Sequence, residues 1–161
     1  MAKKKMARKS RTARATRKTS RKKARPRKTA ARVSNRPDPL LAPLVGADTR
    51  NVGNVRLEVV RAGAARVKRM IYPPRFRWSV DMKPVVGTAL CGHAHVGFLA
   101  RGSIHIEYPD GCKVEFKAPQ VVAIDPGHDG WVVGREPAVL IEFDFERETV
   151  SRLGMPATHE H

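Results

Sequence analysis

The sequence predicts an all-β domain, a sandwich or barrel of short strands, that follows a basic N-terminal tail. Three observations support this prediction. Apolar and polar residues alternate with a period of two in several segments between residues 55 and 146. Turn-forming residues separate these segments at residues 109–111, 125–127 and 134–137. The excess of lysine and arginine is confined to residues 1–36. A domain of roughly 100 residues built from such strands suits a jelly-roll barrel.

The tail is defined by its charge. Seventeen of the 32 lysines and arginines lie in residues 1–36, which contain no acidic residue, and the other 15 are balanced by 15 acidic side chains. A segment with few large apolar residues and strong self-repulsion is expected to be disordered in isolation. Pro37, Pro39 and Pro43 predict an extended linker. The predicted division is therefore a tail and linker over residues 1–50 and a folded domain over residues 51–161.

Nucleic acid, or another polyanion, is the partner that the tail composition favours, through phosphate neutralisation without base readout. A solubilising arm without a dedicated partner and a targeting peptide are the alternatives. In composition the tail resembles the extensions of linker-histone-like proteins. The residues predicted to contact phosphates are Lys3, Lys4, Lys5, Arg8, Lys9, Arg11, Arg14, Arg17, Lys18, Arg21, Lys22, Lys23, Arg25, Arg27 and Lys28.

Five segments have the alternation of half-buried strands, with one apolar face toward a core. In the last of them, Val139 to Glu146, the valine, isoleucine and phenylalanines form the apolar face, and Glu142 and Asp144 lie on the other. A tight turn at Pro109-Asp110-Gly111 predicts a hairpin between two of the segments. A short helix is expected only at Arg147–Leu153. The first four segments are Val55–Val59, Phe76–Met82, Ile104–Tyr108 and Cys112–Phe116.

The expected compartment is the cytoplasm, with association with the nucleoid if the tail binds DNA. No apolar run reaches the length of a transmembrane helix, and no apolar segment of a secretory signal follows the basic start. No membrane partner is therefore expected. Two cysteines, Cys91 and Cys112, do not form a disulfide framework, which favours a reducing environment.

Histidines near the strand ends are the candidates for chemistry. His93 and His95 close a G-x5-H-x-H segment that starts at Gly87, and His128 follows Pro126-Gly127. Imidazoles that point inward from strands suit a metal or ligand pocket. The alternative is that they are ordinary strand and turn residues. His105 alternates with apolar neighbours and is expected to face outward. The residues expected to wall a pocket are Trp78, Phe98 or Leu99, and Trp131.

Over roughly residues 70–146 the chain resembles the small bacterial cupins, through its G-x5-H-x-H opening, HVGFLARGSIHIEYPDG and DPGHDGWVVGREPAVLIEFDF. Leu99 and Ala100 stand where the motif glutamate belongs in one register. In a second register His95 takes the glutamate position and Cys91 a histidine position. The resemblance implies one divalent metal, iron, manganese, nickel or zinc. Its ligands would be His95 and His128, with His93 or Cys91 as the third.

This resemblance and the tail together favour binding or sensing of a small molecule. The tail would tether the protein to nucleic acid, and no strong catalytic activity is expected. A metal-dependent enzyme of dioxygenase or isomerase type is one alternative. A nucleoid-associated structural protein whose barrels form a homodimer is another. No nucleophile elbow, phosphate loop or His-Glu-x-x-His occurs in the chain, so no reaction is specified.

Overall fold

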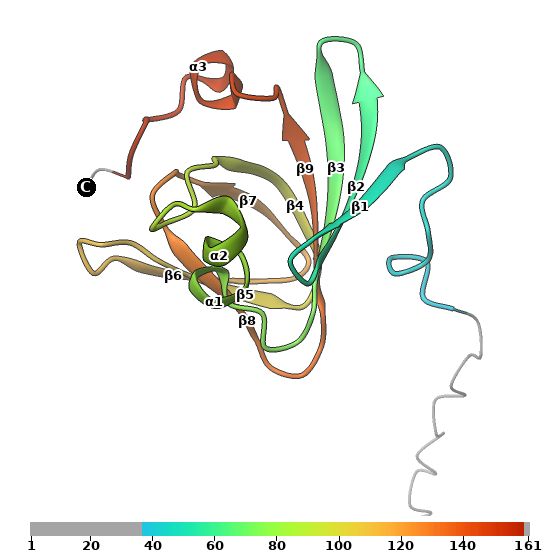
Figure 1. Ribbon diagram of the computed structural model, residues 1–161, viewed down its shortest axis with the longest axis horizontal. Helices are drawn as coiled ribbons and strands as arrows, with labels where there is room; N and C mark the ends of the chain where they lie inside the picture. The colour runs from blue at the N-terminus through green and yellow to red at the C-terminus, as the bar shows by residue number, and fades with distance from the viewer. Residues whose placement is uncertain (1–36, 160–161) are drawn as a thin grey trace, which may run out of the picture. The chain divides into compact units, whose positions relative to one another are not determined.

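The computed structural model describes residues 37–159, which form nine strands and three short helices (Figure 1). The predicted tail contacts of Lys3 to Lys28 lie outside these residues. The strands are β1 (Asp48–Val52), β2 (Val55–Ala62), β3 (Ala65–Tyr72), β4 (His95–Arg101), β5 (Ser103–Glu107), β6 (Lys113–Lys117), β7 (Gln120–Ile124), β8 (Asp129–Val133) and β9 (Ala138–Asp144). The helices are α1 (Trp78–Asp81), α2 (Lys83–Val86) and α3 (Thr149–Leu153).

The strands form two antiparallel sheets. One has six strands in the order β1-β2-β3-β9-β4-β7, and the other has three in the order β6-β5-β8. From β4 onward the chain crosses repeatedly from one sheet to the other. β4, β7 and β9 belong to the larger sheet, and β5, β6 and β8 belong to the smaller one. This order is that of a jelly roll. The predicted all-β jelly-roll fold is confirmed.

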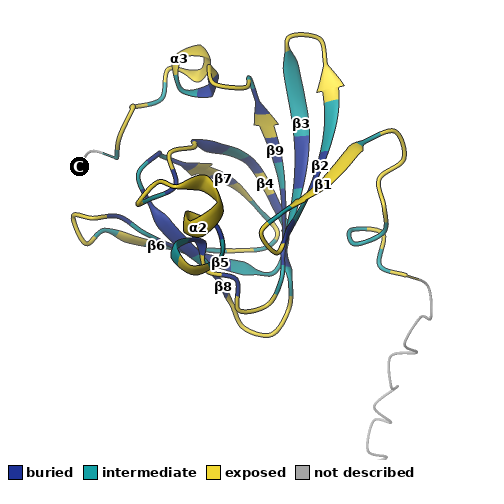
Figure 2. Ribbon diagram, in the orientation of Figure 1, coloured by how far each residue is buried: buried dark blue, intermediate teal, exposed yellow. Residues whose placement is uncertain are grey.

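A single core lies between the two sheets, because the inward residues of both are buried together (Figure 2). Leu99 and Leu140 from the larger sheet and Ile104 and Ile106 from the smaller one belong to it. The hairpin predicted at Pro109–Gly111 is present, since β5 pairs with β6 from Ser103↔Lys117 to Glu107↔Lys113. The apolar parity predicted for β5 therefore places its isoleucines correctly.

The strand predicted over Phe76–Met82 is wrong, because α1 occupies residues 78–81 of this stretch and α2 begins directly after it at Lys83. Trp78 and Met82, four residues apart, are both buried, while Val80 is 65% exposed. A strand would have placed all three on one face. The Asp81 carboxylate accepts a hydrogen bond from the Arg77 N–H at 2.7 Å, and a proline stands in the first turn of α2, where helices tolerate it.

The prediction of which face of β9 points inward is also wrong, because the opposite face is the buried one. Glu142 is 1% exposed and Asp144 is 5% exposed, whereas Phe143 is 55% exposed on the outer face of the sheet. Burial of two carboxylates requires partners, and the inner face of β3 supplies Lys68 to both of them. Partner charges on a neighbouring strand thus override the apolar pattern of β9 itself.

Residues 38–44, named here the N-terminal strap, contact the outer face of β2 and β3. Beneath the strap lies a buried ion pair between Arg69 and Glu58. Arg69 also donates to the carbonyls of Pro39 and Ala42, and Glu58 accepts from the Leu44 N–H. The predicted extended linker is therefore docked on the domain, and the predicted boundary between residues 50 and 51 falls inside β1.

The strap leads to a prediction about truncation. We expect residues 37–161 to unfold cooperatively as a β-rich domain. Residues 51–161 should melt more than about 5 °C lower, because the shorter chain lacks most of β1 and uncovers the Glu58–Arg69 pair. Circular dichroism melting of both chains measures the difference. Equal melting temperatures would show that the strap adds no stability.

Candidate metal and ligand site

Cys91, His95 and His128 come together although they belong to three different parts of the fold. His95 begins β4, Cys91 lies just before it, and His128 stands between β7 and β8. Two backbone hydrogen bonds join the last two segments, from Cys91 N–H to the His128 carbonyl at 2.8 Å and from Gly127 N–H to the Cys91 carbonyl at 2.7 Å. One ligand atom from each of the three side chains lies within 4.8 Å of the other two, and all three residues are buried.

Both imidazoles are held by a hydrogen bond at Nδ1. The Nδ1 of His95 donates to Glu142 Oε1 at 2.6 Å, and the Nδ1 of His128 donates to the carbonyl of Asp125 at 2.6 Å. Because a carbonyl only accepts, the tautomer of His128 is fixed by this contact. Each ring is thereby left with Nε2 as its ligand atom, and the Nε2 of His95 lies 3.4 Å from Cys91 Sγ. Metal-binding histidines are oriented by partners of this kind.

The electrostatics of the group follow from burial and charge together. Burial by itself raises the pKa of Cys91, but the charge of His95 and hydrogen bonds from the neighbouring histidines hold that pKa well below its ordinary value. Burial lowers the pKa of His95, while Glu142 and Cys91 raise it to about 10. The group therefore has the character of a thiolate beside an imidazolium, and a thiolate is the form of cysteine that binds metals.

Glu142, which contacts His95, is itself part of a buried group of charged side chains. Burial favours the neutral form of Glu142, but His95 and Lys68 lower the pKa of this carboxyl to about 2. Lys68 Nζ lies 2.7 Å from Glu142 and 3.0 Å from Asp144. Gly97 pairs with Glu142 across β4 and β9, and a Cβ on Gly97 would lie 1.9 Å from the Ile141 carbonyl oxygen. Glycine at this position lets the two strands approach closely.

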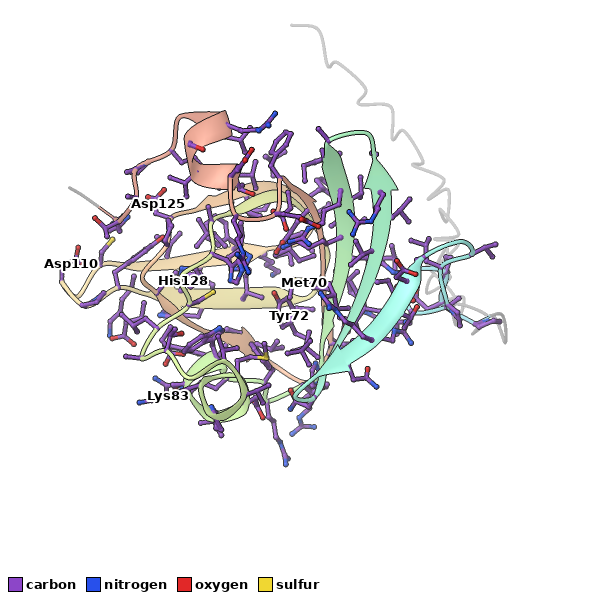
Figure 3. The ribbon with its side chains drawn as sticks, turned by 45° about the horizontal axis from the view of Figure 1, so that its top comes forward. Met70, Tyr72, Lys83, Asp110, Asp125 and His128 are labelled. Carbon is purple, nitrogen blue, oxygen red and sulfur yellow. The ribbon has the colours of Figure 1, made fainter. Side chains whose placement is uncertain are left out.

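A cavity of about 350 Å³ adjoins the three candidate ligands between the two sheets. Met70 and Tyr72 of β3 line it together with His128, and Figure 3 shows these three side chains within the barrel, whereas Lys83 and Asp110 lie at its periphery. Its volume is in the range of small-molecule sites. The cavity thus provides a space of that size next to the Cys-His-His group.

Of the predicted metal ligands, His95, His128 and Cys91 meet, and His93 does not join them. His93 is exposed and borders the cavity at a position between Cys91 and His95. Residues 91, 93 and 95 all border the cavity, although β4 begins only at His95. His93 nevertheless contributes to the low pKa of Cys91 through a hydrogen bond. The third member of the group is therefore Cys91.

The predicted pocket residues divide. Trp78 is buried and borders the cavity. Phe98 does not, because it is 41% exposed on the outer face of β4, and Leu99, although fully buried, belongs to the core outside the cavity lining. These two predictions are corrected.

Trp131 borders the cavity, but its ring stacks on His105 with centroids 4.1 Å apart. His105 lies on the face of β5 opposite Ile104 and Ile106, as its parity predicts. It packs against an aromatic ring there instead of pointing into solvent. This position keeps His105 away from the Cys-His-His group.

Glu142 and Lys68 are the site residues that sequence reasoning missed. The available signal was the pair of acidic residues, Glu142 and Asp144, within an otherwise apolar strand. A strand that alternates in this way without turn residues is expected to be at least half buried. Acidic side chains on such a strand need cationic partners if that face is the inner one.

Comparison with known proteins rests on solved structures. No model of a protein family matches the chain, and no curated protein matches it by sequence. A Cupin 2 conserved barrel domain protein from Salinispora arenicola CNS-205 is similar over 71% of this chain and 94% of its own, with a TM-score of 0.46 and 19% identity. The cupin domain of Cnp3 from Schizosaccharomyces pombe is similar over 69% and 77%, with a TM-score of 0.44 and 9% identity.

A third similar structure is AerE from Microcystis aeruginosa, with a TM-score of 0.46 and 15% identity over 62% of this chain and 46% of that one. Within residues 37–159 no helix has the length and apolar character needed to cross a membrane. Similarities at these TM-scores carry no argument about function. The jelly-roll fold follows from the strand pairing of the chain itself, and the solved structures that are similar to it include cupin barrels.

Proposed function

We propose that the barrel is a binding or sensing module that holds one divalent metal through Cys91, His95 and His128, with a small organic ligand beside it. The observation that carries the proposal is the convergence of one sulfur and two imidazole nitrogens, each imidazole oriented by a hydrogen bond at Nδ1. A sulfur and nitrogen donor set suits zinc, nickel or iron(II) and disfavours manganese, which prefers oxygen ligands. The metal would act as an anchor for a ligand in the adjoining cavity.

A metal-dependent enzyme is the second candidate. The observation that favours it is the cavity next to a three-ligand group, because catalytic metal sites keep a coordination position open for water or substrate. A binding module is preferred because Glu142, the carboxylate that contacts His95, is already engaged with Lys68. Substrate turnover by the metal-loaded protein would establish the enzyme.

The tail is proposed to hold this module at nucleic acid or another polyanion. Its 17 positive charges support the proposal, while the rest of the chain is balanced in charge.

Metal titration tests the proposed site. We expect one zinc ion to bind per chain and to release about one proton at pH 7. The pKa of His95 is raised to about 10, so His95 must lose its Nε2 proton to coordinate, whereas the pKa of Cys91 is held well below its ordinary value by His95, which favours the thiolate before metal binds. Zinc affinity should therefore rise about tenfold per pH unit between pH 7 and 9.

Isothermal titration in buffers of different ionisation enthalpy gives both the stoichiometry and the proton count. His105→Ala, outside the group, serves as the control and should behave as the unmodified chain does. Absence of zinc, nickel and iron(II) binding at micromolar concentrations would overturn the metal site.

A further inference from the structure

The charged groups of the cavity wall are cations, imidazoles and the Cys91 thiolate, which lies 3.4 Å from the Nε2 of the protonated His95, and no carboxylate borders the cavity. Among the residues that line the cavity, Arg50, Arg66 and Lys68 are cationic, and neither aspartate nor glutamate borders it. A ligand in such a cavity meets hydrogen-bond donors and positive charge at its polar end. The absence of carboxylates from the wall indicates which charge a ligand of this cavity would carry.

Two of the three cations form ion pairs with carboxylates that do not border the cavity. Lys68 Nζ contacts Glu142 at 2.7 Å, and Arg66 Nη2 contacts Asp144 at 2.7 Å. Both carboxylates are buried and lie outside the cavity lining. They fix the cations in place and leave no acceptor of their own on the wall. The cavity therefore has preorganised donors whose charge is already compensated.

Arg50 differs from these two cations. It lies on β1, where it pairs with Leu57, which in turn pairs with Met70 of β3. Directly paired residues of neighbouring strands share a face of the sheet, and Leu57 and Met70 both line the cavity, so Arg50 faces inward as well. No hydrogen bond or ion pair joins Arg50 to any other residue of the described range 37–159. It is therefore an exposed cation of the edge strand β1 that borders the cavity and has no counter-ion within those residues.

Much of the remaining wall is apolar. Residues of β3 and of the α1 region contribute two aromatic rings and two thioethers, namely Tyr72, Trp78, Met70 and Met82. Such a surface takes the apolar body of a ligand. We propose that the cavity selects an organic monoanion, a carboxylate on an apolar or aromatic body, and that Arg50 recognises the carboxylate. One uncompensated cation corresponds to one negative charge. This inference rests on the proposed ligand-binding function.

Three probes with the same body and different charge test the inference. They are 4-phenylbutanoate, its neutral amide and 4-phenylbutylamine, titrated into the full-length, metal-free chain at 0.15 M salt. We expect the carboxylate to bind at least five times more tightly than the amide, and the amine to bind most weakly. Arg50→Met should remove the preference by weakening carboxylate binding about fivefold to tenfold, and it should leave amide binding unchanged.

Arg135→Met is the matched control. Arg135 is likewise exposed, but it follows β8 outside the lining of this cavity. The basic tail is present in all three chains, so nonspecific binding of carboxylates to it cancels in the comparison. Equal melting temperatures of the variants would verify that Arg50→Met leaves the fold intact.

Two outcomes overturn the inference in different ways. If all three probes bind equally, or Arg50→Met binds the carboxylate as the unmodified chain does, anion selection is wrong while ligand binding in the cavity stands. If none of the probes and none of a wider panel of small organic molecules binds either the metal-free or the zinc-loaded chain, the ligand-binding function itself fails, and the inference fails with it.

Discussion

Replacing His95 by alanine is expected to lower the affinity for zinc by at least about a thousandfold. The variant loses one of the three ligands of the proposed site. It also removes the imidazole whose Nδ1 contacts Glu142, so the Glu142–Lys68 pair no longer contacts a ligand. His128→Ala is expected to have an effect of the same order. Glu142→Gln, which keeps a hydrogen-bond partner for His95 but removes its charge, should weaken zinc binding by about 10-fold to 100-fold. Competition with a chromogenic chelator measures all three affinities.

The controls for this prediction separate coordination from folding. His105→Ala removes an imidazole that stacks on Trp131 outside the group, and it should bind zinc normally. If His95→Ala does not fold, because it disrupts the buried charges around Glu142, His128→Ala still tests the site from the turn between β7 and β8. Unchanged zinc affinity in a folded His128→Ala chain would exclude the proposed ligand set.

Deleting residues 1–36 is expected to reduce the affinity for double-stranded DNA or for RNA by more than about a thousandfold. The deletion removes all 17 excess charges, and what remains carries 15 basic and 15 acidic residues. Binding by the full chain should also fall by about 10³-fold or more between 50 and 200 mM salt, with little dependence on base sequence. Fluorescence anisotropy with two unrelated duplexes of equal length measures both effects.

A chain in which the order of residues 2–36 is scrambled is the matched control, because it keeps the tail composition and charge. If phosphate neutralisation is the mechanism, the scrambled chain should bind as tightly as the original. Undiminished binding by residues 37–161 would instead locate the nucleic-acid surface on the barrel. Loss of binding on scrambling would indicate readout by specific tail residues.

The fold could be predicted where each strand carries its own signal. The β5–β6 hairpin has clear alternation and a Pro-Asp-Gly turn, and both were sufficient. β3 was missed because consecutive cations, Lys68 and Arg69, obscure its alternation, and both are buried by acids on other segments. Residues 76–82 alternate as a strand would, but spacing alone also permits Trp78 and Met82 to share a helical face. Only tertiary contacts decide between the two.

The candidate site could be predicted in part. The histidine spacing and the short segment after Pro126 identified His95 and His128, because strand ends and turns are where side chains reach a barrel interior. Glu142 escaped prediction because a carboxylate on an alternating strand ordinarily faces water. Its burial depends on His95 from β4 and Lys68 from β3, which are 47 and 74 residues away in the sequence. Such a partnership is a property of the sheet order and not of any local pattern.

β3 has a consequence for how this protein can diverge. Lys68 on its inner face is matched to Glu142, and Arg69 on its outer face is matched to Glu58 beneath the strap. Loss of either member of a buried ion pair leaves an isolated charge, which costs roughly 3–5 kcal/mol, a large share of the stability of a single domain. Substitutions at these positions should therefore be correlated among related sequences. Positions 68 and 142 should change together, and positions 58 and 69 should change together.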